Sequence, residues 1–242
     1  MHREKDLREL VRRLTDAGGA NLTAIVLYGS AADHEFQEQH SDLNILCLLQ
    51  RLDGAELANL QPVGHWWWRK GHPAPVVFTL DELVEAADVF AIELLDMKAR
   101  HRMLFGEDFF SRIDVPMNLH RFQVERELRT NVLRLRQNYL RMRGRRSELA
   151  ELLIASASTF VTLFRHSLIA LGELSAPESS RAAVQQLAAL LEFDAAGFLA
   201  VLDIRQGKRA ATDMDDRRTF AAYLEVVTRV SEEMDRRLAV PT

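Results

Sequence analysis

Residues 25–49 read IVLYGSAADHEFQEQHSDLNILCLL, and this stretch decides the fold. It spans most of two apolar runs of strand length and the segment that joins them. The runs are LTAIVLYGS from Leu22 to Ser30 and DLNILCLLQ from Asp42 to Gln50. Apolar and β-branched residues over such lengths predict two buried strands. A Gly-Ser pair closes the first run, and an Asp-x-Asn pattern opens the second. The sequence therefore predicts two neighbouring strands with small and polar groups where the chain leaves one and enters the other.

Strands and helices alternate on both sides of this stretch. Apolar spacing predicts a helix over residues 3–17, which ends at a Gly-Gly pair, and another from Ala55 to Lys70, interrupted at Pro62. A short strand, Pro75–Phe78, precedes a helix start at which Thr79 and Glu82 match a capping box. This alternation to about residue 113 indicates an α/β domain.

After Pro116 no strand signal remains, and apolar residues recur at helical spacing. We expect helices at about 117–143, 147–172, 179–193, 195–206 and 214–239, with short connections typical of an antiparallel bundle. The segment SRIDVP separates two unlike units. The predicted fold class is α/β (α+β): a mixed-sheet domain over residues 1–113, followed by an all-α antiparallel helical bundle over residues 117–242.

Composition limits the class of protein. The 242 residues are 48% hydrophobic and 27% charged, which predicts a globular chain with a sizeable core. A net charge of −4 excludes a uniformly basic nucleic-acid binder. No run approaches the roughly 18 uncharged apolar residues of a membrane span. The amino terminus is charged from residue 2, and the lone Cys47 has no disulfide partner in the chain, so we expect a cytoplasmic protein.

The Gly-Ser and Asp-x-Asn patterns carry a family resemblance. Gly29-Ser30 after a strand, eleven intervening residues and Asp42 before the next strand resemble the signature of the DNA polymerase β-type nucleotidyltransferase superfamily. The stretch AIELLDMKARHRMLFGEDFF, residues 91–110, resembles the helix and short strand that close the catalytic domain in small bacterial members. The helical half resembles, by architecture alone, the domains that follow the transferase unit in kanamycin-nucleotidyltransferase-like and MNT/HEPN-type proteins.

The resemblance implies roles for four residues. Gly29 and Ser30 would approach and hydrogen-bond the phosphates of a nucleoside triphosphate, and Asp42 would be the catalytic carboxylate that binds Mg²⁺. Asn44 occupies the second acidic position beside the nucleotide, where its amide supplies no charge and binds a hard cation weakly. A third acid is expected on the strand Pro75–Phe78, which contains none. Losing one preorganised charged group costs on the order of a hundredfold in rate.

We therefore expect a nucleotidyltransferase-fold protein with a degenerate metal site that at most binds an NTP, with weak Mg²⁺ affinity, and acts as a regulatory or interaction module. One alternative is a weak Mg²⁺-dependent nucleotidyltransferase that moves an NMP from an NTP to a hydroxyl acceptor. Another is an RNA- or protein-binding scaffold. The main hypothesis includes no membrane or nucleic-acid partner and leaves open a homo-oligomer or a protein partner.

The predicted helix 117–143 is the most basic element of the chain. Residues 115–150 carry nine Lys and Arg against three Asp and Glu. This basic side could bind an RNA backbone, but apolar residues on the other faces favour a bundle helix with a solvated basic side. In kanamycin-type enzymes a glutamate of the helical domain acts as the base, and Glu125 or Glu127 could take that part. Nothing in the spacing selects either.

Overall fold

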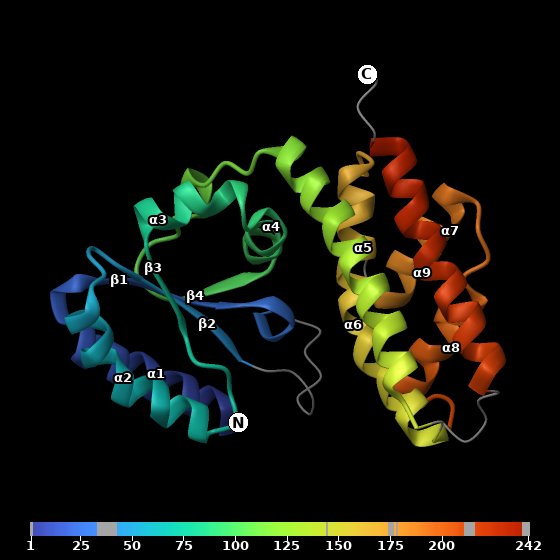
Figure 1. The fold of residues 1–242 in the computed structure, drawn as a ribbon. Coiled ribbons are helices and arrows are strands. Elements are labelled where there is room, and N and C mark those ends of the chain that lie inside the picture. The colour runs from blue at the N-terminus through green and yellow to red at the C-terminus, as the bar shows by residue number, and fades with distance from the viewer. Residues whose placement is uncertain are drawn as a thin grey trace. The chain divides into compact units, whose positions relative to one another are not determined.

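The computed structural model describes residues 2–32, 43–143, 145–173, 177, 179–210 and 216–238. The chain divides into two compact units, Met1–Pro116 and Met117–Thr242. The first contains a mixed sheet with helices, and the described part of the second is helical (Figure 1). This element order confirms the predicted fold class.

A four-stranded sheet forms the centre of the first unit. Its strands are β1 (Leu22–Tyr28), β2 (Asn44–Leu49), β3 (Val76–Thr79) and β4 (His101–Phe105), in the spatial order β3-β2-β1-β4. β1 is antiparallel to both β2 and β4, whereas β3 is parallel to β2. Tyr28 pairs with Asn44 on one side and with His101 on the other. The end of β1 therefore lies between the beginnings of β2 and β4.

Helices cover both faces of this sheet (Figure 1). α1 (His2–Gly18) and α2 (Gly54–Arg69) pack on the face that carries Ile25 and Leu27. α3 (Leu80–Glu85) and α4 (Ala91–Ala99) pack on the face that carries Ala24 and Val26. Short 3-10 turns occupy Gly19–Asn21, Gly29–Ala32, Ala86–Asp88 and Phe110–Arg112. Because alternate residues of β1 enter two separate cores, the strand is apolar and buried from Ala24 to Leu27.

Helix α2 runs through Pro62 without a break, so the predicted interruption is wrong. A proline inside a helix costs about 3 kcal/mol, because it removes a backbone hydrogen bond and crowds the preceding turn. Leu60, Val63 and Trp67 are buried against the sheet on both sides of the proline. Burial of each such side chain contributes about 1.5–3 kcal/mol, so together they outweigh the cost and hold the helix continuous.

The second unit is built from five helices in the described residues. They are α5 (Met117–Arg141), α6 (Arg146–Ala170), α7 (Ser180–Leu191), α8 (Ala196–Arg205) and α9 (Asp216–Leu238), and each end lies within two residues of its predicted position. Within α6, the stretch Ser147–Ala170 is long and apolar enough to cross a membrane by length and composition, which the sequence analysis did not anticipate. Because α6 contacts α5, α7, α8 and α9, packing accounts for its composition.

Helices α8 and α9 make the closest approach in this bundle. Gly197 of α8 lies against Ala222 of α9, where a Cβ added to the glycine would stand 2.5 Å from the Cβ of Ala222. Beside this contact, Phe198 stacks on Tyr223 with ring centroids 4.8 Å apart. Both rings are fully buried. The missing side chain at Gly197 therefore allows two helices to meet backbone to side chain around an aromatic core.

Candidate functional site

The first part of the candidate site is the turn that follows β1. Gly29 has a φ of +80°, a backbone conformation that glycine adopts without strain. Its N–H donates to the carbonyl oxygen of Arg100 at 3.1 Å, which fixes the turn to the residue before β4. The 3-10 turn Gly29–Ala32 begins here. The side chain of Ser30 lies outside the described part of the structure.

The second part is Asn44, the first residue of β2. It is half-buried and is the register partner of Tyr28, the residue before Gly29. A Cβ placed on Gly29 would lie 3.5 Å from the side-chain nitrogen of Asn44. The structure therefore brings Gly29 and Asn44 together, although fifteen positions separate them in the sequence. Asp42, the predicted metal ligand, lies outside the described residues.

The third strand places no carboxylate beside Asn44. β3 begins at Val76, which pairs with Leu46, and its sequence VVFT contains no acid. Glu82 lies beyond the far end of β3, where its carboxylate accepts from the N–H of Thr79 at 2.8 Å. The N–H of Glu82 donates in turn to the Thr79 hydroxyl at 3.2 Å, which confirms the predicted capping box. The role of Glu82 is to cap α3.

Metal binding is not supported by the side chains that the structure describes. In residues 2–32, 43–143 and the described parts beyond, no three His, Cys, Asp or Glu side chains form a group that could hold an ion. At the second acidic position the structure has the neutral amide of Asn44. A hard cation such as Mg²⁺ prefers several carboxylate and water oxygens. These residues therefore do not fit a two-metal centre.

One acidic residue near this end of the sheet was missed by sequence reasoning. Burial, and secondarily the charge of Glu93 on α4, raise the pKa of Tyr28. Glu93 is exposed on α4, and Tyr28 is the register partner of Asn44. No local pattern could have identified it, because Glu93 approaches Tyr28 only through the packing of α4 on the sheet.

Several arginines of α5 form hydrogen bonds or ion pairs within the helical unit. Arg121 donates to the carbonyl oxygen of Ala170 at 3.2 Å, and Arg136 donates to the hydroxyl of Thr228 at 3.2 Å. Arg129 bonds the carboxylates of Glu125 at 3.0 Å and Asp235 at 2.7 Å, and these bonds raise its pKa. Glu127 accepts from Asn131. These contacts favour the interpretation of α5 as a bundle helix.

The structure buries Cys47 in the sheet and two histidines in the helical unit. Cys47 is buried in β2, and burial raises the pKa of its thiol to about 12, so it packs as a small apolar residue. His120 and His166 have no metal-ligand spacing in the sequence, yet they meet in the bundle. The Nε2 atom of His120 lies 3.0 Å from Nδ1 of His166, and both residues are fully buried.

Comparison with known proteins identifies the fold. No protein-family model and no curated protein matches the sequence. Among solved structures, the chain resembles spectinomycin adenyltransferase AAD(9) from Enterococcus faecialis, whose crystal structure contains ATP and spectinomycin. The TM-score is 0.57 at 12% sequence identity, and the match covers 93% of this chain and 98% of that one. At this identity the likeness shows a shared nucleotidyltransferase fold that extends through both units.

Proposed function

We propose that this protein binds a nucleoside triphosphate at the turn after β1, but has a degenerate metal site and acts as a regulatory or interaction module. The observation that carries the proposal is Asn44, whose neutral amide lies beside Gly29 where a second carboxylate would be needed. The spectinomycin adenyltransferase of the same fold was solved with ATP, which supports the choice of a nucleotide as ligand.

The turn itself supports phosphate binding. The positive φ of Gly29 leaves no side chain between the turn and an approaching ligand. Backbone N–H groups of Ser30 and the residues after it are the donors that such a turn offers to phosphate oxygens. The amide of Asn44 can donate from the side chain as well as accept. These groups are suited to binding a triphosphate, which requires donors, more than to catalysis, which requires carboxylates.

The neutral amide of Asn44 and the lack of an acid on β3 support the degenerate site. β3 carries no acid, and Glu82 caps α3 instead. Transfer of a nucleotide needs preorganised charges at the attacking and leaving oxygens, and each missing group costs about a hundredfold in rate. With two of three acids replaced, the expected rate falls by roughly ten thousandfold or more.

A second candidate function is a weak transferase, and Glu93 is the observation that favours it. After burial, its charge is the second cause of the raised pKa of Tyr28, the residue before Gly29. In that case Glu93 would supply the acid that β3 lacks. The acceptor would be a hydroxyl group, as in nucleotidyl transfer by proteins of this fold.

Binding is tested by calorimetry with ATP and Mg²⁺, using two matched glycine variants. Gly29→Ala strains the phosphate turn, whereas Gly19→Ala strains a turn with a φ of +51° next to α1, at the other end of β1. We expect Gly29→Ala to weaken ATP binding by about tenfold or more and Gly19→Ala to leave it unchanged. Equal affinity in the wild type and Gly29→Ala would place the nucleotide elsewhere.

Catalysis is tested by pyrophosphate release from each of the four NTPs. We expect none above background. Turnover in the usual range of roughly 1–1,000 s⁻¹ that Asp42→Ala abolishes would contradict the degenerate site. Asn44→Asp restores an acid and should raise Mn²⁺ affinity by roughly tenfold without starting transfer. If Asn44→Asp does gain transfer and Glu93→Gln removes it, the weak-transferase alternative is supported instead.

A further inference from the structure

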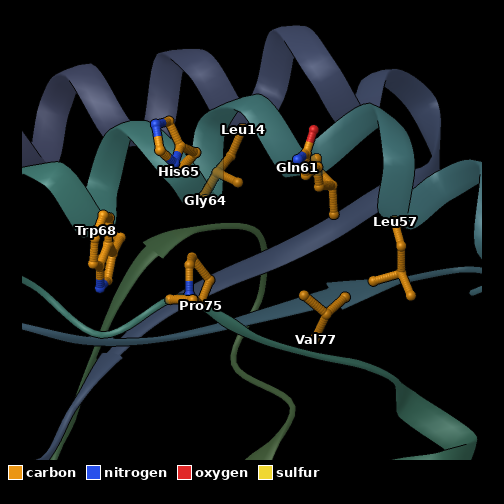
Figure 2. A pocket seen from close by; sticks show the side chains of 10 residues that line it. Leu14, Leu57, Gln61, Gly64, His65, Trp68, Pro75 and Val77 are labelled. Carbon is orange, nitrogen blue, oxygen red and sulfur yellow. The ribbon is translucent and has the colours of Figure 1, made fainter.

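A pocket lies in the first unit, between α2 and the beginning of β3. Its volume is about 540 Å³, within the roughly 300–1,000 Å³ of small-molecule pockets. Leu60 of α2 and Leu14 of the neighbouring helix α1 form part of its lining. Figure 2 shows Trp68 and Leu57 extending from α2 toward Pro75 and Val77. The cavity is therefore bounded by one helix face and one edge of the sheet.

The lining is apolar and carries no charge. None of its ten residues is Asp, Glu, Lys or Arg, and the only polar side chains are those of Gln61 and His65. Moving an ion into such surroundings is costly, because no opposite charge compensates for its lost hydration. The pocket is thus unsuited to a triphosphate. It suits an uncharged molecule that makes one or two hydrogen bonds.

Two large apolar side chains on α2 are exposed at the ends of the pocket. Trp68 is 62% exposed and Leu57 is 49% exposed. Eleven residues of helix separate them, which corresponds to about 16 Å. Trp68 also stacks on His65, with ring centroids 6.0 Å apart. An indole held this way beside Pro75 offers a flat surface to an aromatic ring.

Gly64 is the feature that intramolecular packing does not explain. Glycine inside a helix is destabilising relative to alanine, so it usually marks a close contact. A Cβ on Gly64 would meet no atom within 4 Å, and the residue lines the pocket (Figure 2). At Gly64 no side chain therefore covers the backbone of α2 where it lines the pocket.

We propose that this pocket binds an uncharged, aromatic small molecule, which lies against the backbone at Gly64 and stacks on Trp68. Gln61 and His65 supply its hydrogen bonds. Neither Gly29 nor Asn44 is among its lining residues, and the ligand differs from a nucleotide in lacking phosphate charge.

The proposal is tested on the full chain with N-phenyl-1-naphthylamine, a neutral aromatic dye whose fluorescence rises in apolar surroundings. We expect saturable binding of one dye per chain. Gly64→Leu places a side chain in the pocket, where its Cβ meets no neighbouring atom within 4 Å, and should weaken binding by about tenfold or more, with an unchanged far-UV spectrum. Gly54→Leu is the matched control, because it adds the same side chain to open space on the same helix outside the lining.

Trp68→Ser is the second variant, and it removes a ring that is 62% exposed. It should also weaken dye binding, while excess ATP should leave the dye affinity unchanged. Dye uptake that does not saturate, or that is equal in the wild type, Gly64→Leu and Trp68→Ser, would overturn the proposal. Displacement of the dye by ATP would also overturn it, because it would place the dye in the nucleotide site.

Discussion

Replacement of Gly197 by alanine tests the packing of the helical unit most directly. The added Cβ would lie 2.5 Å from the Cβ of Ala222 and 2.6 Å from its carbonyl carbon. Each distance is about 1 Å shorter than an ordinary carbon contact, so α8 and α9 must move apart. Overpacking of this kind costs about 1–3 kcal/mol, and the gain in helix propensity returns at most about 1 kcal/mol. We expect a net loss of about 1–2 kcal/mol.

Gly64→Ala is the matched comparison, because its Cβ meets nothing within 4 Å. The same substitution in the interior of α2 should therefore stabilise the first unit by about 0.5–1 kcal/mol. Urea unfolding separates the two effects. All three tryptophans of the chain are at positions 66–68, so their fluorescence reports the first unit, and circular dichroism reports the helices of both.

Gly197→Ala should lower the midpoint of the helical transition by roughly 0.5–1 M urea. Adding Ala222→Gly removes the side chain that the new Cβ meets, so the double variant should lose less stability than the sum of the two single variants. A Gly197→Ala protein as stable as the wild type, or single effects that simply add, would refute the close contact between α8 and α9.

Two further predictions concern Cys47 and the division of the chain. Because burial raises the pKa of the Cys47 thiol to about 12, the folded protein should resist iodoacetamide at pH 8 and react only when unfolded, as followed by mass spectrometry. The buried neutral thiol should also make stability fall as the pH rises from about 9 toward 12, because at this position only the unfolded chain ionises in that range. Cys47→Ala should show a smaller decline than the wild type, the remainder coming from Tyr28 and Tyr223, whose pKa values burial also raises. A polypeptide spanning residues 117–242 should be soluble and strongly helical by far-UV circular dichroism, and a disordered spectrum would argue against two units that fold independently.

Local patterns were sufficient to predict most elements of this fold. The capping box at Thr79 and Glu82 involves neighbours in sequence, and the helices from Met117 onward follow directly from apolar spacing. Pro62 was misjudged because its local cost is offset by burial of Leu60 and Trp67, which depends on the sheet beneath. A local rule therefore failed where tertiary packing supplied the larger energy.

The candidate site was only partly accessible to the same reasoning. The closeness of Gly29 and Asn44 follows from two adjacent strands joined by a polar segment, which the sequence pattern contains. The effect of Glu93 on Tyr28 does not follow from the sequence pattern, because it depends on how α4 packs on the sheet. The pocket beside Gly64 was also missed, since a glycine in a helix reveals an open space only when its surroundings are known.

The buried contact between His120 and His166 links the tautomers of two side chains. If Nε2–H of His120 donates, Nδ1 of His166 must accept, and both neutral rings then carry their proton on Nε2. If Nδ1–H of His166 donates instead, both rings carry it on Nδ1. The two imidazoles therefore change tautomer only together, and the ¹⁵N chemical shifts of both rings should always report the same form.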